Sequence, residues 1–298
     1  LFAVIRGVDK YATLLRATVA GAGNDHRLGA NEAPPAIVSI FLGDQLTDLF
    51  EQLQKGTAQS SKQGGLLKLG VSSLPELPKD CTDRNRTSPF AYTGKKFEFR
   101  MPGSSQSLSP ANFTLNTIVA DALCDIANAL EEAEGQEEIS LRAQQLLQDY
   151  AKKHSRIVFN GDNYAAAWVE EAARRGLPNI GNTVDSLLRL TDPENIDVFA
   201  RHHVLTSEEL GARQEVLLEN YVMTVNIEAE AMLQMAKRQI LPAVITYAGN
   251  LAGTANAIAA SGRAGIAESA LLEKVIDLNA RLYREIEVLE GALEQAGS

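Results

Sequence analysis

Cysteine, histidine and tryptophan are scarce in this chain of 298 residues, which has two cysteines, four histidines and one tryptophan. The cysteines, Cys81 and Cys124, form no Cys-X-X-Cys pair and have no histidine at ligand spacing, which argues against a zinc site or a disulfide framework. Reduced, partly buried thiols are expected instead, and they are typical of a cytoplasmic protein. No signal-peptide pattern is visible, because Arg6, Asp9 and Lys10 interrupt the apolar start.

Two common phosphate-binding motifs are also absent. The sequence has no GxxxxGK[ST] loop, and Gly21-Ala-Gly23 is too short for a GxGxxG fingerprint. Basic residues are in the minority, since 28 lysines and arginines stand against 38 acidic residues and give a formal net charge of −10. We therefore expect no nucleic acid or membrane partner, although a local arginine cluster could still bind an anionic substrate.

A long stretch between Arg238 and Arg263 contains no charged residue. Its Asn, Thr, Gly and Pro residues argue against a membrane span, so a helix buried between neighbouring helices is expected. Pro242 should kink or end that helix, because proline lacks a backbone N–H.

Two segments, 26–35 and 82–102, carry clustered charges beside turn residues. Residues 96–101 alternate between charged and apolar, so a strand would place Lys96, Glu98 and Arg100 on one face. With Arg86 just upstream, this mixture suits a phosphate and a divalent cation bound side by side. The residues alone also allow a plainer interpretation, in which Glu98 forms a surface ion pair with Lys96 or Arg100.

The two segments resemble glutamine synthetase, specifically its long type III form. Arg27-Leu, followed by Glu32-Ala-Pro, resembles the family's substrate-carboxylate and flap loop. Asn85-Arg86-Thr resembles its phosphate loop, and Glu98-x-Arg100 resembles its Glu-x-Arg strand. These motifs cover the first third of the chain, and the remainder is similar in general character to the helical C-terminal extension of type III forms.

The resemblance implies a role for each motif residue. Arg27 would bind the α-carboxylate of the substrate, and Glu32 would be the flap carboxylate that shields an acyl phosphate and deprotonates ammonium. Arg86 and Arg100 would stabilise the phosphoryl group during transfer, since a guanidinium is a planar fork of donors that stays charged.

The resemblance also implies two cofactors, ATP and Mg²⁺ or Mn²⁺. Glu98 would be a metal ligand, and its partners must come from elsewhere, because hard divalent ions take several oxygen ligands. Arg86 and Lys96 would contact ATP, although family members often have arginine where this chain has Lys96, and lysine cannot form a bidentate fork.

The expected fold is α+β. Residues 1–135 would be the C-terminal part of a catalytic domain with a curved antiparallel sheet and helices, and residues 136–298 would be a mainly helical domain. Helical spacing of apolar residues predicts helices at 1–20, about 35–54 and 116–133. A tight turn at Thr93-Gly94 should precede the strand.

Two features of the helical part are specific. Thr206 and Glu209 form a capping box that predicts the start of a long helix. The last helix has a heptad-like stripe that indicates packing inside an antiparallel bundle or, alternatively, a contact between subunits. The stripe consists of Leu271, Val275, Leu278, Leu282, Ile286, Leu289 and Leu293.

As a whole, the resemblance implies ATP-dependent ligation of ammonia to glutamate through a γ-glutamyl phosphate, in a ring-shaped homo-oligomer. It also implies an N-terminal β-grasp domain and further metal-binding glutamates that are not found in residues 1–298. We therefore expect a fragment without the N-terminal half of the site, inactive alone. Two alternatives stay open: a related superfamily ligase or kinase that acts on another substrate, and a non-catalytic helical assembly or regulatory module.

Overall fold

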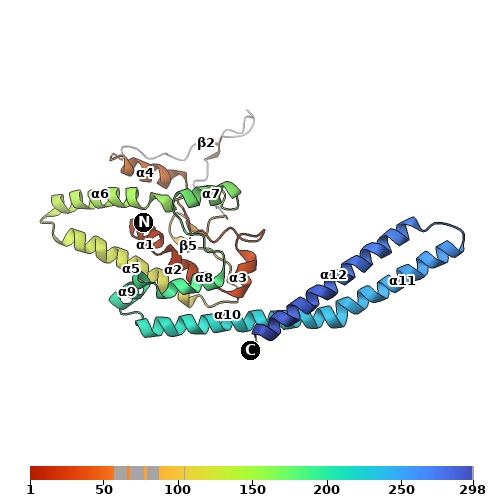
Figure 1. Cartoon of the computed structure of the whole chain (residues 1–298). Helices are drawn as coiled ribbons and strands as arrows, with labels where there is room; N and C mark the ends of the chain where they lie inside the picture. The colour runs from red at the N-terminus through yellow and green to blue at the C-terminus, as the bar shows by residue number, and fades with distance from the viewer. Residues whose placement is uncertain (57–65, 68–76, 79–86, 104, 297–298) are drawn as a thin grey trace. The chain divides into compact units, whose positions relative to one another are not determined.

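The structure is a computed structural model that describes residues 1–56, 66–67, 77–78, 87–103 and 105–296. Its contacts divide the chain into two compact units, Leu1–Leu218 and Glu219–Ser298. Figure 1 shows the order of the elements along the chain. The domain boundary predicted near residue 135 stays a prediction, because a spatial division describes packing rather than the extent of a family domain.

The N-terminal helix predicted for residues 1–20 is two helices, α1 (Phe2–Lys10) and α2 (Ala12–Ala17). They meet at Tyr11, whose backbone leaves the helical range at φ −110° and ψ 31°. The Tyr11 side chain is 1% exposed and donates a hydrogen bond to Asp121 at 3.0 Å. A short third helix, α3 (Ala22–Arg27), follows and carries Arg27 in its last turn.

The helix predicted for 35–54 is wrong in its first part, because only α4 (Asp44–Gln54) is helical. Residues 36–43 are all buried, and Ile40–Phe41 form the strand β1. A continuous buried apolar run with β-branched residues suits a strand, and periodicity alone does not distinguish it from a helix. Asn160 holds the end of this run, since its Oδ1 accepts from the backbone N–H groups of Leu42 and Gly43 at 3.0 and 3.1 Å.

The sheet of the first unit has three strands in the order β1, β4 (Phe90–Tyr92), β5 (Phe97–Phe99). β1 runs parallel to β4, and β4 runs antiparallel to β5, so the curved antiparallel sheet is confirmed only in part. The predicted turn at Thr93-Gly94 is confirmed, with Gly94 at φ 87° and the Thr93 N–H donating to the Lys96 carbonyl at 2.9 Å. A second, separate pair joins β2 (Leu66–Leu67) and β3 (Leu77–Pro78).

Helices cover this sheet and form most of the core of the first unit. They are α5 (Ser109–Glu131), α6 (Gln136–Lys153), α7 (Ala166–Arg174), α8 (Thr183–Leu187) and α9 (Pro193–Arg201), with short 3₁₀ turns at Ser155–Ile157 and Leu188–Thr191. α5 begins earlier than predicted, with Pro110 in its first turn, where the missing N–H breaks no helical hydrogen bond. The core includes Ile5, Leu14, Ile40, Ile118 and Trp168.

One helix among the described residues, α5, is long and apolar enough to cross a membrane by length and composition alone. A single such helix is weak support for a span, since core helices pass the same test. In this fold α5 packs on α1, and its Ile118 and Ala122 side chains are fully buried.

α10 (Ser207–Met235) begins in the first unit and continues into the second. Its capping box is confirmed: Glu209 Oε2 accepts from the Thr206 N–H at 2.8 Å, and Thr206 Oγ1 accepts from the Glu209 N–H at 3.2 Å. A π-helical turn, Ala236–Ile240, separates α10 from α11 (Leu241–Ala260). The predicted interruption at Pro242 is confirmed only as a change to π geometry just before it, because Ile240 and Leu241 keep helical backbone angles and the helix does not end there.

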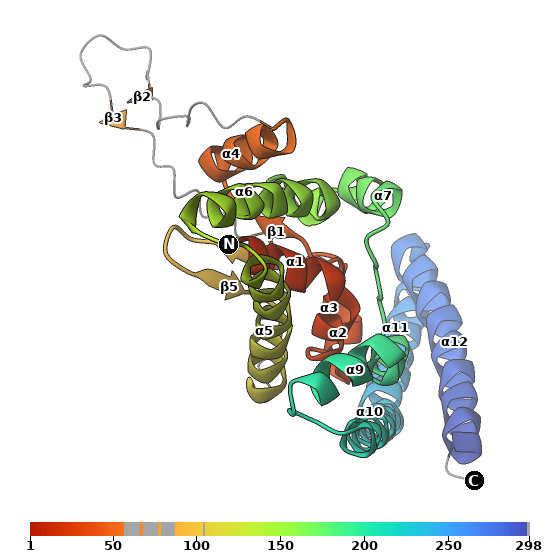
Figure 2. The same cartoon turned by 90° about the vertical axis from the view of Figure 1, so that its left-hand side faces the viewer.

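The second unit is a hairpin in which α11 packs along α12 (Ile266–Ala296), as Figures 1 and 2 both show. The predicted stripe is displaced at two positions, since Leu271 and Leu278 are 42% and 50% exposed. The less exposed stripe of α12 consists of Leu272, Val275, Asn279, Leu282, Ile286, Leu289 and Leu293. Among the described residues of this unit only Ala236 and Ile286 are buried, so the hairpin leaves much apolar surface uncovered.

Candidate functional site

The loop after Arg27 is short and closed by its own backbone. The Gly29 N–H donates to the carbonyls of Ala33 and Pro34 at 3.2 and 3.1 Å, and Gly29 itself has φ 79°. A positive φ favours glycine, because a Cβ atom is strained there. The loop therefore presents Glu32 at its tip while its two ends stay together.

Arg27 and Glu32, predicted to bind the substrate carboxylate and to form the flap, pair with each other. Arg27 Nη2 lies 3.0 Å from Glu32 Oε1, with the side chains 32% and 65% exposed. Arg27 Nε is buried and has no hydrogen-bond partner. An exposed ion pair of this kind contributes about 0–1 kcal/mol, so a better carboxylate ligand could displace Glu32.

The prediction that Lys96, Glu98 and Arg100 share one face of β5 is confirmed. Arg100 Nε and Nη2 donate to Glu98 Oε2 at 3.0 and 2.9 Å, and Lys96 Nζ lies 3.2 Å from Glu98 Oε1. On the opposite face of the sheet, the Phe90 ring of the neighbouring strand β4 lies 5.5 Å from the Phe97 ring and 6.0 Å from the Phe99 ring. Hydrogen bonds from Arg100 and then Lys96 lower the pKa of Glu98, which keeps it ionised in mildly acidic solution.

Glu98 supplies one possible metal ligand. Among residues 1–56, 87–103 and 105–296 there is no cluster of three or more His, Cys, Asp or Glu side chains that could hold an ion. The described part of the chain therefore offers Glu98 without a cluster of further ligands for Mg²⁺ or Mn²⁺ beside it. The Glu98 carboxylate is engaged by two cations, which matches the ion-pair interpretation and leaves its metal-binding role a prediction.

The two motif segments are joined through the end of α3. The Asn24 side chain, 4% exposed, donates to the carbonyls of Val19 at 2.6 Å and Pro102 at 2.9 Å. Asn24 is one helical turn before Arg27, and Pro102 follows Arg100 closely. Buried hydrogen bonds of this type fix the relative position of two segments. Arg86 lies outside the described residues, so its position relative to Arg100 stays a prediction.

A loop at residues 160–164 holds both motif segments, and the sequence analysis did not identify it. Tyr164 Oη donates to the Glu32 backbone carbonyl at 3.1 Å. The Asn163 N–H donates to Thr87 Oγ1 at 3.1 Å, directly after Arg86, and Asn163 Oδ1 accepts from Ser39 Oγ at 2.8 Å. No local pattern could have revealed this role, because Tyr164 is 132 residues from Glu32.

A buried charge cluster joins α1, α5 and α9. Asp121, 1% exposed, contacts the Tyr11 hydroxyl at 3.0 Å, Arg201 Nη1 at 2.6 Å and Lys10 Nζ at 3.5 Å. Burial alone would raise the pKa of Asp121, but the Tyr11 hydrogen bond and the charges of Lys10, Arg201 and Arg6 outweigh it and lower the pKa. Burial and the bond to Asp121 in turn raise the pKa of Tyr11.

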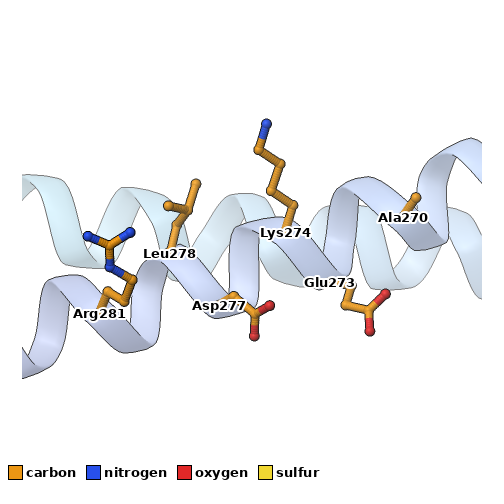
Figure 3. Close-up of a pocket in the computed structure, with 6 residues that line it drawn as sticks. All are labelled: Ala270, Glu273, Lys274, Asp277, Leu278 and Arg281. Atoms are coloured by element: carbon orange, nitrogen blue, oxygen red, sulfur yellow. The ribbon is translucent and has the colours of Figure 1, made fainter.

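A separate hollow of about 370 Å³ lies on α12 in the second unit. It is lined by Ala270, Glu273, Lys274, Asp277, Leu278 and Arg281. Figure 3 shows the two acidic side chains pointing one way and the two basic side chains pointing the other, all from one helix. It contains none of the predicted site residues.

Comparison with known proteins identifies the class. Residues 142–259 match the family model for the glutamine synthetase C-terminal domain. The type-3 glutamine synthetase of Dictyostelium discoideum is 44% identical over 261 residues, which cover 87% of this chain and 35% of that protein. Glutamine synthetases of Butyrivibrio fibrisolvens and Bacteroides fragilis (strain YCH46) are 39% and 40% identical over 84% and 83% of the chain and 35% of their own length.

The resemblance to type III glutamine synthetase is therefore confirmed. Residues 142–259, which match the family model for the C-terminal domain, lie within the predicted helical domain. The chain spans about a third of the length of the curated relatives that it matches.

Proposed function

We propose that the protein to which this chain belongs joins ammonia to glutamate with cleavage of ATP and yields glutamine. The observation that carries the proposal is 44% identity to a type-3 glutamine synthetase over 87% of the chain. In the proposed reaction the γ-carboxylate of glutamate takes the terminal phosphoryl group of ATP, which leaves as ADP. Ammonia then attacks the γ-glutamyl phosphate and releases inorganic phosphate.

Arg27 and Glu32 serve the two substrates in this proposal. Arg27 receives the α-carboxylate of glutamate, since a guanidinium binds carboxylate in bidentate fashion. Glu32, released from its 3.0 Å contact with Arg27, covers the acyl phosphate and accepts a proton from ammonium. A closing loop excludes water, which would otherwise hydrolyse the acyl phosphate. The support is that the closed loop already brings both side chains together at its tip.

Arg86, Lys96, Glu98 and Arg100 serve the phosphoryl group. Arg100 and Arg86 offset negative charge on the transferring phosphoryl oxygens, where preorganised donors act most strongly. Lys96 contacts the nucleotide, and Glu98 is one ligand of Mg²⁺ or Mn²⁺, whose other ligands lie outside the described residues. When bound, that ion aligns phosphate oxygens and offsets their charge.

We also propose that the protein forms a ring-shaped homo-oligomer and that its partners are glutamate, ammonia and ATP. The uncovered apolar surface of the α11–α12 hairpin favours assembly. The same surface is the observation that favours the second candidate function, a helical assembly module without catalysis.

The test is glutamine formation from glutamate, ammonia and Mg-ATP, assayed on the 298-residue chain and on the whole gene product that contains it. We expect activity in the whole gene product only. Phosphate release that does not depend on glutamate would favour a ligase that acts on another carboxylate substrate. No phosphate release at all would favour the assembly module.

Glu98→Ala in the whole gene product separates catalysis from folding. Glu98 is a third exposed, and its partners among the described residues are neighbours on its own hairpin, so we expect thermal stability to stay within a few degrees. Turnover should be lost. Unchanged turnover would remove Glu98 from the site.

A further inference from the structure

A cavity of about 570 Å³ lies inside the first unit, between α2 and α9 and the first turns of α5 and α10. None of the predicted site residues lines it. A volume of a few hundred Å³ and a mainly apolar lining are typical of small-molecule sites.

The walls of the cavity are apolar and fixed. Leu14 and Phe199 are 0% and 1% exposed, and the Phe199 ring packs against the Phe113 ring at 5.8 Å. Leu210 is also buried, whereas Leu217 is 38% exposed near the opening. A ligand that fills this space must therefore have an apolar body.

The charge at the rim favours an anion. Arg213 lines the cavity with its guanidinium 5.7 Å from the centre of the Phe113 ring, and within the described part of the chain no carboxylate forms an ion pair with it. The rim also has one acidic residue, Glu209, which accepts the Thr206 N–H of the capping box and whose charge partly offsets that of Arg213. The first turns of α5 and α10 add the positive ends of two long helices.

One buried polar group in the wall lacks a partner. Thr114 is 0% exposed and lines the cavity, and its hydroxyl has no hydrogen-bond partner. Unpaired buried hydroxyl groups are uncommon, because burial removes their bonds to water. The hydroxyl has no accessible surface, so a ligand atom reaches it only when the neighbouring side chains move.

We propose that this cavity binds a small monocarboxylate with an apolar body. The carboxylate lies at the rim beside Arg213, and the apolar body packs against Val216 and Leu217, the lining side chains with accessible apolar surface. Such a ligand differs from glutamate, which is polar along its whole length. The inference goes beyond the proposed ligase reaction and does not depend on it.

The test is calorimetric titration of the whole gene product that contains this chain with octanoate, 1-octanol and octylamine, which share one apolar body and differ in head group. We expect octanoate to bind at least about tenfold more tightly than the alcohol or the amine, a difference that one charge-assisted contact can supply. Arg213→Gln should weaken octanoate to the affinity of octanol and leave octanol unchanged. Arg238→Gln, an exposed arginine that does not line the cavity, is the matched control and should change neither.

A second variant tests the location. Ala212→Phe places a ring in the cavity from an exposed position on α10, so it should abolish binding of both octanoate and octanol without loss of helical circular dichroism. Absence of octanoate binding, equal binding of the three compounds, or octanoate affinity unaffected by Arg213→Gln or Ala212→Phe would each overturn the proposal. Because the readout is binding, these outcomes are distinguishable from failure of the glutamine assay.

Discussion

At the scale of single residues, the arrangement around Glu98 sets what Arg100 can do. Two nitrogen atoms of Arg100 contact one carboxylate oxygen, so the guanidinium lies against the charged face of β5 rather than in solvent. Lysine at this position would keep the charge and lose the fork.

We therefore predict that Arg100→Lys in the whole gene product lowers kcat for glutamine formation by about 10²-fold, the usual effect of losing a donor to a developing negative charge. The melting temperature should stay within a few degrees, since exposed ion pairs contribute about 0–1 kcal/mol. Arg174→Lys is the control, because Arg174 is an exposed arginine paired with Glu171 at 2.7 Å. Equal kcat in wild type and Arg100→Lys would argue against a role in phosphoryl transfer.

Asp121 is a residue that governs stability rather than chemistry. Its carboxylate is buried among Tyr11, Lys10 and Arg201, and its removal leaves Lys10 and Arg201 without the anion that they share. We predict that Asp121→Asn lowers the free energy of unfolding at pH about 7 by about 3 kcal/mol. Urea unfolding followed by circular dichroism measures this difference.

The difference in unfolding free energy between wild type and Asp121→Asn should depend on pH. The pKa of Asp121 is lower in the folded protein than in the unfolded chain, where it is about 3.9. Ionised Asp121 therefore contributes fully to the free energy of unfolding above the unfolded-state pKa, and this contribution is lost as the pH falls through the folded-state pKa. The difference between wild type and Asp121→Asn should therefore shrink at pH about 3. A difference that stays constant between the two pH values would show that the variant acts through packing rather than through the charge.

At the scale of elements, the loop at 160–164 is the support that joins the two motif segments. The Tyr164 hydroxyl donates a hydrogen bond to the Glu32 carbonyl at 3.1 Å, and this bond joins two residues that are far apart in the sequence. Half-exposed hydrogen bonds contribute about 0.5–1.5 kcal/mol.

We predict that Tyr164→Phe raises KM for ammonium by up to about tenfold, because a less anchored flap loop positions Glu32 poorly. The melting temperature should change little. Tyr247→Phe, a tyrosine of similar exposure in the second unit, is the control and should leave KM unchanged. If Tyr164→Phe lowered the melting temperature and left KM unaffected, the bond would have a purely structural role.

Local elements were predictable where their signal is local. The capping box at Thr206, the turn at Gly94 and the alternation along 96–101 each depend on residues within one turn or one strand, and each is confirmed. The segment 36–43 was not predictable, because its strand identity depends on pairing with Phe90 far along the chain. Likewise, the Arg27–Glu32 pair lies within one motif, whereas the support from Tyr164 exists only in the fold.

At the scale of the whole molecule, the two units differ in how they bury apolar groups. The described core consists of residues from the first unit, including Leu14, Ile40 and Trp168. The helix α11 has no buried residue, and α12 has one, Ile286. A two-helix hairpin with so little burial is marginal by itself, since stability in water comes mainly from apolar burial.

We predict that the outward faces of this hairpin are covered when the protein assembles with further copies of itself. Ile245 and Tyr247 on α11 are 55% and 48% exposed, and Ile276 and Tyr283 on α12 are both 52% exposed.

Replacing Ile245 and Ile276 with lysine should reduce the molar mass measured by light scattering to that of a smaller species, because buried unpaired charge opposes contact between subunits. Helical circular dichroism should be unchanged, as both side chains already face outward. The control Asp277→Lys makes the same change in net charge as the double variant, on α12, without removing apolar surface, and it should leave the assembly intact. If the double variant kept the wild-type molar mass, the exposed faces of α11 and α12 would not be subunit contacts, and the bundle interpretation of the heptad-like stripe would be favoured.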